Sequence, residues 1–217
     1  MKLVNSLVLL AAIAAAQNSV TTPVDNEQVK VINVTVPPHQ KGKMHDHKIN
    51  RVMIYLQAGK QELVFQDGKK QPLAWKAGEV KWSAAAGNHT AEIVSDKPVT
   101  IIEVELKKGA PAKVKPAGDL DPVKLDPKHY KVEFENAQVR VLRVKIGGKE
   151  TVPMHVHSRD RVVAYITDMD FRVTGGDGKA VHATHKAGDV TFSGEAKHKE
   201  ENLSDKPLEL VVVELKG

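Results

Sequence analysis

The sequence predicts an all-β protein made of two tandem antiparallel barrels, which are related to each other by an internal repeat. Three observations predict this class: residues 26–107 return as residues 136–216, the apolar residues occur in short Val-rich runs, and turn signals separate these runs. The chain has 217 residues, of which 41% are hydrophobic and 27% are charged. This length is sufficient for two small domains of about 100 residues each.

The first residues have the pattern of a secretory signal peptide, which we assign to residues 1–16. Met1 and Lys2 precede an apolar run at residues 7–16, and small residues end this run before Gln17, as at a signal cleavage site. The run is too short to span a bilayer. We therefore expect export, cleavage and a periplasmic or secreted mature protein without a membrane anchor; a buried N-terminal helix is the alternative.

The repeat also predicts the domain boundaries. Its matched segments are residues 29–32 with 139–142, 44–45 with 154–155, 67–69 with 177–179, 76–78 with 186–188, 95–98 with 204–207, and 104–107 with 213–216. We expect an N-terminal domain at residues 17–107 and a C-terminal domain at residues 129–217. Residues 108–128 contain four prolines and little apolar periodicity, so they are expected to form an extended linker.

Within each copy the pattern is that of strands rather than helices. Residues 63–65, 79–82, 99–106 and 208–215 are rich in apolar and β-branched residues, and helix-length apolar stripes are missing after the signal. The Asp67-Gly68 step favours the positive φ of a tight hairpin. Two tryptophans, Trp75 and Trp82, occur only in the first copy, opposite Thr184 and Phe192 in the second, and are interpreted as core residues.

Composition excludes several classes of function. The net charge of +5 comes from 32 basic and 27 acidic residues that are spread along the chain, which argues against a nucleic-acid groove. A pI near 9.2 is compatible with anionic ligands. There is no cysteine, so a metal site would need histidine and oxygen ligands. Gly-rich phosphate loops and a Ser-His-Asp order motif are absent, which disfavours ATPases and serine hydrolases.

Six of the ten histidines occupy repeated positions and are the candidate metal ligands. In each copy two of them alternate along one expected strand, so they share a face, and the third follows far enough away to come from another strand. Imidazoles that converge in this way can hold a divalent metal. The candidates are His45, His47 and His89 in the first copy and His155, His157 and His198 in the second. The unmatched histidines, His39, His129, His182 and His185, are interpreted as surface or incidental.

At these positions the sequence resembles the cupin superfamily, and the two copies together resemble a bicupin. The first motif of the family, a His-x-His pair with a Glu a few residues later, is matched in its histidines by residues 45–47 and 155–157. The resemblance covers nearly all of the chain after the signal. It implies that each copy is a double-stranded β-helix barrel with a mononuclear divalent metal, commonly iron, manganese, zinc, nickel or copper, at its open end.

The second cupin motif runs from a Gly through a His to an Asn, and the two copies match it unequally. Gly78 precedes His89 by the family's spacing, whereas the interval that follows Gly188 is one residue shorter. Asn202 matches the final Asn of the motif, and the first copy has Ile93 there.

The chain departs from the family where the first motif has its Glu, because Arg51 and Arg161 stand there. Arginine cannot ligate a cation, so each site offers three neutral nitrogens and no anionic donor from this motif. Arg51 and Arg161, like Tyr55 and Tyr165, share strand parity with the histidine pairs and are expected to face the same cavities. These four residues would bind an anionic or enolate-forming small molecule beside the metal. The alternative for the arginines is a structural pair with acids such as Glu92 or Glu201.

The sequence leaves three functions open and assigns no catalytic residue. The first is an oxygenase or isomerase that acts on a small anionic or dicarbonyl compound, by analogy with the family. The second is a non-catalytic metal or small-molecule binding protein. The third is a duplication that only stabilises the fold by covering sheet edges. The expected partner is a small anionic molecule, not nucleic acid and not a membrane after signal cleavage, and a homodimer is compatible with the sequence.

Overall fold

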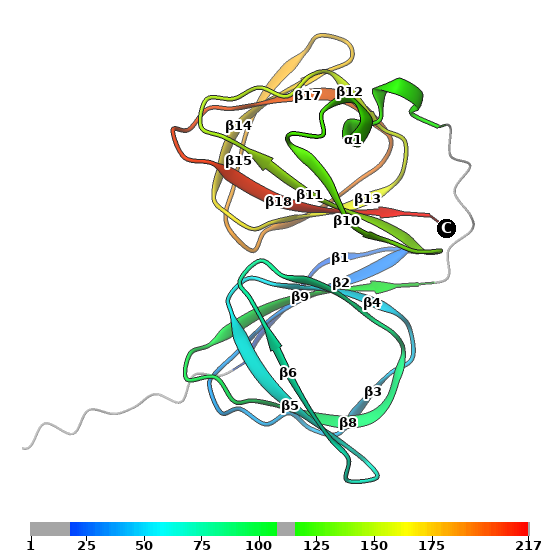
Figure 1. The fold of residues 1–217 in the computed structure, drawn as a ribbon, viewed down its shortest axis with the longest axis vertical. Coiled ribbons are helices and arrows are strands. Elements are labelled where there is room, and N and C mark those ends of the chain that lie inside the picture. The colour runs from blue at the N-terminus through cyan, green and yellow to red at the C-terminus, as the bar shows by residue number, and fades with distance from the viewer. Residues whose placement is uncertain (1–17, 108–115, 217) are drawn as a thin grey trace, which may run out of the picture.

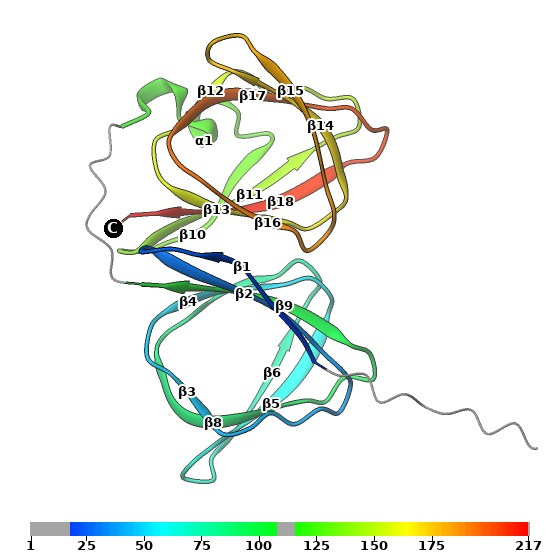
Figure 2. The ribbon, with the colours of Figure 1, turned by 180° about the vertical axis from the view of Figure 1, so that it is seen from behind.

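The computed structural model describes residues 18–107 and 116–216, and it confirms an all-β protein built as two barrels (Figures 1 and 2). The predicted signal peptide, residues 108–115 of the predicted linker and residue 217 lie outside the described residues. Within the described ranges, no helix has both the length and the apolar character needed to cross a membrane.

The first barrel contains nine strands that form two antiparallel sheets, ordered β1-β2-β9-β4-β7 and β3-β8-β5-β6. Its strands are β1 (Ser19–Asp25), β2 (Val29–Val36), β3 (His45–His47), β4 (Arg51–Tyr55), β5 (Gly59–Phe65), β6 (Lys70–Trp75), β7 (Val80–Ser83), β8 (Ala86–Ile93) and β9 (Val99–Leu106). The hairpin between β5 and β6 turns at Gly68, whose φ of 82° is the positive angle that the Asp-Gly step predicts.

The second barrel repeats this topology, with sheets ordered β10-β11-β18-β13-β16 and β12-β17-β14-β15. Its strands are β10 (Tyr130–Glu135), β11 (Val139–Ile146), β12 (His155–His157), β13 (Arg161–Tyr165), β14 (Met169–Gly175), β15 (Ala180–His185), β16 (Val190–Ser193), β17 (Ala196–Asn202) and β18 (Leu208–Leu215). The identical strand order in both barrels confirms that the sequence repeat is a repeat of structure.

Part of the predicted linker is folded rather than extended. It contains the 3-10 helix η1 (Gly118–Leu120) and the short helix α1 (Pro122–Leu125). Asp121 caps α1, because its side chain accepts from the backbone N–H of Val123 at 3.1 Å, and the same carboxylate pairs with Arg140 of β11 at 2.9 Å. This ion pair fastens the linker to the second barrel.

The two five-stranded sheets pack face to face, with β1, β2, β4 and β9 beside β10, β11, β13 and β18 (Figures 1 and 2). One buried cluster joins residues of both sheets, among them Val31 and Ile54 from the first barrel and Val141 and Val213 from the second. Inward-facing residues of the same strands form a separate core inside each barrel. The duplication therefore covers the faces of these sheets, and not chiefly their edges as the structural hypothesis proposed.

Polar contacts across this interface are reciprocal. Asn33 of β2 donates to the Gly188 carbonyl at 2.8 Å, and Arg143, at the corresponding position of β11, donates to the Gly78 carbonyl at 2.6 Å. The side-chain amide of Gln28 donates to Asp160 at 2.9 Å, and that of Asn50 donates to Gln138 at 2.6 Å. These pairs are also reciprocal, because Gln138 matches Gln28 and Asp160 matches Asn50 in the repeat. The barrels therefore pack like the subunits of a two-fold symmetric dimer, joined in one chain.

Asn202 has a structural part in the second barrel. Its amide donates to the carbonyls of Ile146, Gly147 and Lys206 at 3.2, 3.0 and 2.8 Å, and its Oδ1 accepts from the Ser204 backbone N–H at 3.0 Å. The side chain is only 1% exposed. Asn202, which matches the last position of the second cupin motif, therefore holds together the loops that its side chain contacts. In the first barrel Ile93 occupies this position and packs in the apolar core instead.

We expect Asn202→Ala to lower the free energy of unfolding by about 2 to 3 kcal/mol, because it leaves buried carbonyls without donors. Urea unfolding measures this loss. The exposed Asn88, whose side chain makes a long hydrogen bond of 3.3 Å to Gln66, supplies the control, and Asn88→Ala should cost less than about 0.5 kcal/mol. Equal effects of the two substitutions would contradict the structural role of Asn202.

Candidate metal centres

The structure brings the three predicted histidines of each copy together at a strand pair inside each barrel. In each group the ligand atoms lie within 4.8 Å of one another. Strands β3 and β12 carry the His-x-His pairs, and the third histidine lies on the neighbouring strand, β8 or β17, opposite the first member of the pair. The two triplets are His45, His47 and His89, and His155, His157 and His198. Their role as metal ligands stays a prediction.

The unequal length of the second motif has a local structural cause. In the second barrel β12 and β17 pair in regular register, with His157 opposite Ala196. In the first barrel the register shifts between His45 and His47, so that β8 carries an additional residue before His89. This irregularity is a β-bulge that absorbs the extra residue and keeps His89 directed at the histidine pair.

The imidazoles of the second barrel are oriented with Nε2 toward one another. Nδ1 of His155 lies 2.9 Å from the Pro153 carbonyl, and Nδ1 of His157 lies 2.9 Å from Glu214 Oε1. Because both partners are acceptors, Nδ1 carries the proton and Nε2 offers a lone pair. The two Nε2 atoms are 3.2 Å apart. Hydrogen bonds of this kind orient metal-binding histidines in proteins.

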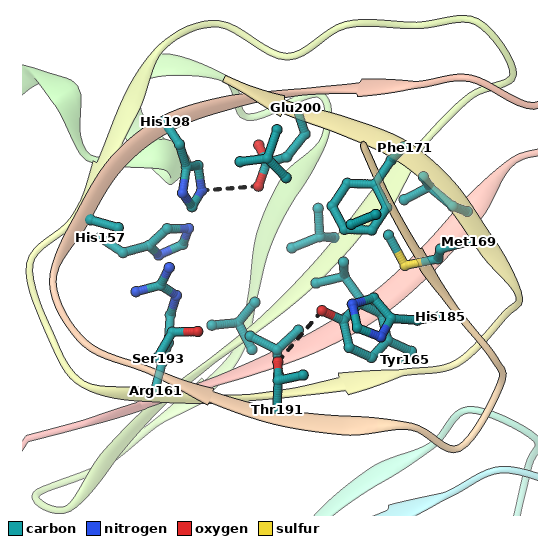
Figure 3. Close-up of a pocket in the computed structure, with 18 of the residues that line it drawn as sticks. His157, Arg161, Tyr165, Met169, Phe171, His185, Thr191, Ser193, His198 and Glu200 are labelled. Carbon is teal, nitrogen blue, oxygen red and sulfur yellow. Dashed lines mark hydrogen bonds and ion pairs between the residues drawn. The ribbon is translucent and has the colours of Figure 1, made fainter. Parts of the chain in front are cut away.

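A carboxylate that sequence reasoning missed completes the second group of histidines. Glu200 follows His198 by two residues on β17 and therefore faces the same side. Its Oε1 lies 2.9 Å from His198 Nε2, and its Oε2 lies 3.8 Å from His155 Nε2 (Figure 3). Tyr130, a second missed residue, donates its hydroxyl proton to Glu200 Oε2 at 3.2 Å. The alternation of His198 and Glu200 was the available signal.

The donor set of the second barrel fits a divalent cation. Three imidazole nitrogens and one carboxylate converge, and His198 Nε2 is buried without a well-directed hydrogen bond. Burial lowers the pKa of His155 and lowers that of His157 well below its usual range, which favours the neutral form that binds metal. Burial alone would raise the pKa of Glu200, but its contact with His198 lowers it.

The first barrel presents a poorer donor set. The position of Glu200 is occupied by Ala91, so the corresponding carboxylate is missing. His47 Nε2 already accepts a hydrogen bond from Arg51 Nη1 at 2.8 Å. Burial, followed by the charge of Arg51, lowers the pKa of His47 to about 3. A metal ion at this site would have to displace the guanidinium, whose charge opposes it.

The two arginines face the sites as predicted, but they differ in their partners. Arg51 pairs with Glu103 of β9 at 2.7 Å, so its charge is neutralised inside the barrel. Arg161 is only 4% exposed and donates to the Gly194 carbonyl, and no carboxylate of the described residues forms an ion pair with it. At the position of Glu103 the second barrel has Val212. Arg161 is therefore a buried cation beside the second site.

The alternative for the arginines, a structural pair with an acid, applies to Arg51 but with a different partner from the two acids named above. Arg51 has Glu103 rather than Glu92 as its partner, and Glu201 pairs with Arg172 at 2.8 Å on the outside of the barrel. The strand register explains both results, because Arg51 lies on β4 beside β9, whereas Glu201 points to the opposite face of β17 from His198.

The predicted tyrosines lie within the barrels, each stacked on another ring. Tyr55 stacks on Trp75 with ring centroids 4.4 Å apart, and Tyr165 stacks on His185 at 3.9 Å. The counterpart of Trp75 is thus His185 and not Thr184, since Gly59 pairs with Trp75 as Met169 pairs with His185. The core interpretation of Trp75 agrees with its burial in the first barrel.

Two of the four unmatched histidines were interpreted wrongly. His185 lines the cavity of the second barrel. His129 is buried and lies 2.6 Å from Asp126 through Nδ1 and 2.9 Å from Glu150 through Nε2, which ties the end of the linker to the barrel. His39 and His182 lie on the surface, as expected. The unmatched positions gave no sequence signal, because the partners of these rings come from other strands and loops.

A cavity of about 450 Å³ occupies the second barrel and reaches this candidate site. His157, Arg161, His198 and Glu200 lie at one end of it (Figure 3). The remaining walls are largely apolar and come from β11, β13, β14 and β18. A small molecule in this cavity would meet the histidines, the carboxylate and the guanidinium at once.

Comparison with known proteins identifies the architecture. No family model matches the chain, and no curated protein matches its sequence. Among solved structures it is similar to AerE of Microcystis aeruginosa, with 12% identity, a TM-score of 0.69 and coverage of 94% of each chain. It is also similar to the Bacillus subtilis oxalate decarboxylase, which has Mn(II) centres, with 13% identity, a TM-score of 0.59 and coverage of 87% of this chain and 69% of that chain.

A third similar structure is the Lactobacillus farciminis oxalate decarboxylase in its formate complex, with 13% identity, a TM-score of 0.61 and coverage of 92% of this chain and 81% of that chain. The chain has the bicupin fold. At these identities the likeness is one of fold alone. The chain carries two groups of three histidines that suit a divalent metal, and the two groups differ in their surroundings.

We expect Arg51→Met to strengthen metal binding in the first barrel by about tenfold or more, because it frees His47 Nε2 and leaves Glu103 as an anionic neighbour. Titration of the variant with Mn(II) or Zn(II) by calorimetry measures the change, with His155→Ala as a background that weakens the second site. Arg161→Met in the same background is the matched control, and it should leave the metal affinity of the first barrel unchanged because Arg161 lies in the other barrel. An unchanged affinity in Arg51→Met would contradict the blocking role of the guanidinium.

Proposed function

We propose that this chain is an exported bicupin whose second barrel binds a divalent metal ion and a small anionic or dicarbonyl compound beside it. One observation carries the proposal: three imidazoles and Glu200 converge at a cavity that Arg161 also lines, and Arg161 forms no ion pair with a carboxylate of the described residues. Glu200 and Glu214 act on Arg161 only from beyond ion-pair distance, so the carboxylate of a ligand would give this buried guanidinium a directly paired anion.

His155, His157, His198 and Glu200 would hold the metal, and iron, manganese, zinc, nickel and copper are all compatible with nitrogen and oxygen donors. Manganese is the first metal to test, given the Mn(II) centres of the similar oxalate decarboxylase. When bound, the metal would act as a Lewis acid or activate oxygen, which suits oxygenase or isomerase chemistry.

The residues of the chain itself would prepare the ligand for that chemistry. Arg161 would bind the carboxylate of the ligand and set its orientation. Tyr130, which donates to Glu200, would fix the direction of the Glu200 carboxylate. The apolar walls would exclude water from the anion and strengthen each charged contact. A non-catalytic binding protein would need the same groups, so binding is tested first.

The first barrel has a different part in this proposal. Its guanidinium is paired with Glu103 and hydrogen-bonded to His47, and its outer sheet face covers that of the second barrel. These contacts favour a mainly structural role with weak metal affinity. The structural hypothesis from the sequence thus applies to one copy rather than to both.

We expect one tightly bound metal per chain, located in the second barrel. Elemental analysis after reconstitution with manganese, iron or zinc should show that His155→Ala loses this metal, whereas His45→Ala, the matched change in the first barrel, retains it. Equal loss in both variants would contradict the asymmetry, and a parent protein that takes up none of these metals would overturn the proposed function.

The proposed export rests on the sequence of residues 1–16, for which cleavage would leave Gln17 as the first residue of the mature protein. Mass spectrometry of the protein expressed in a bacterial host, with separate cytoplasmic, periplasmic and culture fractions, tests this. The expected product begins at Gln17 outside the cytoplasm. Full-length protein confined to the cytoplasm would contradict export, and replacing residues 7–12 by polar residues provides the control.

A further inference from the structure

The cavity of the second barrel is elongated, and its two ends differ in chemistry. The candidate metal ligands and Arg161 lie at one end, while Met169, Phe171 and the stacked pair of Tyr165 and His185 lie at the other (Figure 3). Its volume of about 450 Å³ falls within the range of roughly 300 to 1,000 Å³ that holds drug-sized ligands. A two-carbon acid would leave most of this space unfilled.

The walls between the two ends are largely apolar. Ile146, Leu208, Leu210, Val212 and Phe171 are among the apolar residues that line the cavity, and Thr191 and Ser193 are polar members of its lining. The ring of Phe171 lies 5.9 Å, centroid to centroid, from that of His185, which also stacks on Tyr165, so three rings border the end away from the histidine triplet. Apolar surface of this kind binds an apolar ligand group because burial removes both surfaces from water.

The corresponding region of the first barrel has larger side chains on β6. Leu73 stands in place of Ala183, and Trp75 in place of His185. Trp75 packs against Tyr55 in the core, and a Cβ at Gly59 would come within 2.7 Å of the indole, so Gly59 makes room for it where the second barrel has Met169. The two barrels therefore fill this region with different side chains, and in the second barrel Ala183 and His185 are among the residues that line the cavity.

We infer that the ligand of the second barrel is an amphipathic anion, namely a small carboxylate or 2-oxo acid that bears an aryl or branched apolar group. This inference rests on the proposed function for its anionic end. The carboxylate would pair with Arg161 next to the metal ligands, and the apolar group would extend along Val212 and Leu210 toward Phe171. Polar two-carbon or three-carbon acids would use only the first half of the site.

The test compares pyruvate with phenylpyruvate, which share a head group and differ by a phenyl ring. Calorimetric titration uses the full mature chain loaded with Mn(II). Phenylpyruvate should bind about tenfold or more tightly than pyruvate, because the ring is buried among apolar side chains. Arg161→Gln should weaken both ligands by about the same factor, of roughly ten or more, while the metal content stays the same.

Substitutions in the wall then locate the phenyl ring. Ala183→Leu introduces the residue of the first barrel and should remove most of the preference for phenylpyruvate, and Ala183→Val, a smaller change, should reduce it less. Ala180→Leu is the matched control, because Ala180 is exposed on the same strand and does not line the cavity, and it should retain the full preference.

The possible failures are distinguishable. Equal affinities for the two acids in the parent protein would overturn the amphipathic ligand and leave the anion site intact, as would a preference that Ala183→Leu does not alter. If the metal-loaded protein binds neither acid, the proposed anion site fails and the inference fails with it.

Discussion

The structure depends on the alternation of side chains along strands that are buried on both faces. In β18, Val211 and Val213 point toward the other barrel, whereas Val212 and Glu214 point into their own. Because successive residues of a strand face opposite sides, one face can form the apolar interface while the other builds the site. Glu214 shows the result: a buried carboxylate beside Val213 of the apolar interface, directed into its own barrel and 2.9 Å from His157.

The face-to-face packing of the barrels allows their interiors to differ. The reciprocal contacts at Gly78 and Gly188 retain the symmetry of the duplication on the outside of each barrel. Inside, Ala91 of the first barrel corresponds to Glu200 of the second, and Glu103 of the first corresponds to Val212 of the second. Each barrel therefore has a glutamate at only one of these two positions, and the position differs between the barrels. In the first barrel this glutamate neutralises the arginine, and in the second it joins the histidines.

This exchange changes what each histidine group can bind. A guanidinium that is paired and hydrogen-bonded to an imidazole lone pair satisfies the site internally, as Arg51 does with Glu103 and His47. A guanidinium without a carboxylate, such as Arg161, leaves a buried positive charge facing a cavity. Buried charges are tolerated when they are paired, so an anionic ligand gains most binding free energy beside Arg161.

The sequence by itself determined the fold class, the duplication and the two histidine triplets. Local patterns carry this information, because a repeat, a period of two and a His-x-His spacing are each visible in consecutive residues. Only the tertiary structure decided that Glu200 joins His198, that Arg51 pairs with Glu103, and that the second barrel retains a cavity. The spacing of His198 and Glu200 is a local signal that they share a face, but their contact, the Arg51–Glu103 pair and the cavity depend on which side chains meet when a barrel closes.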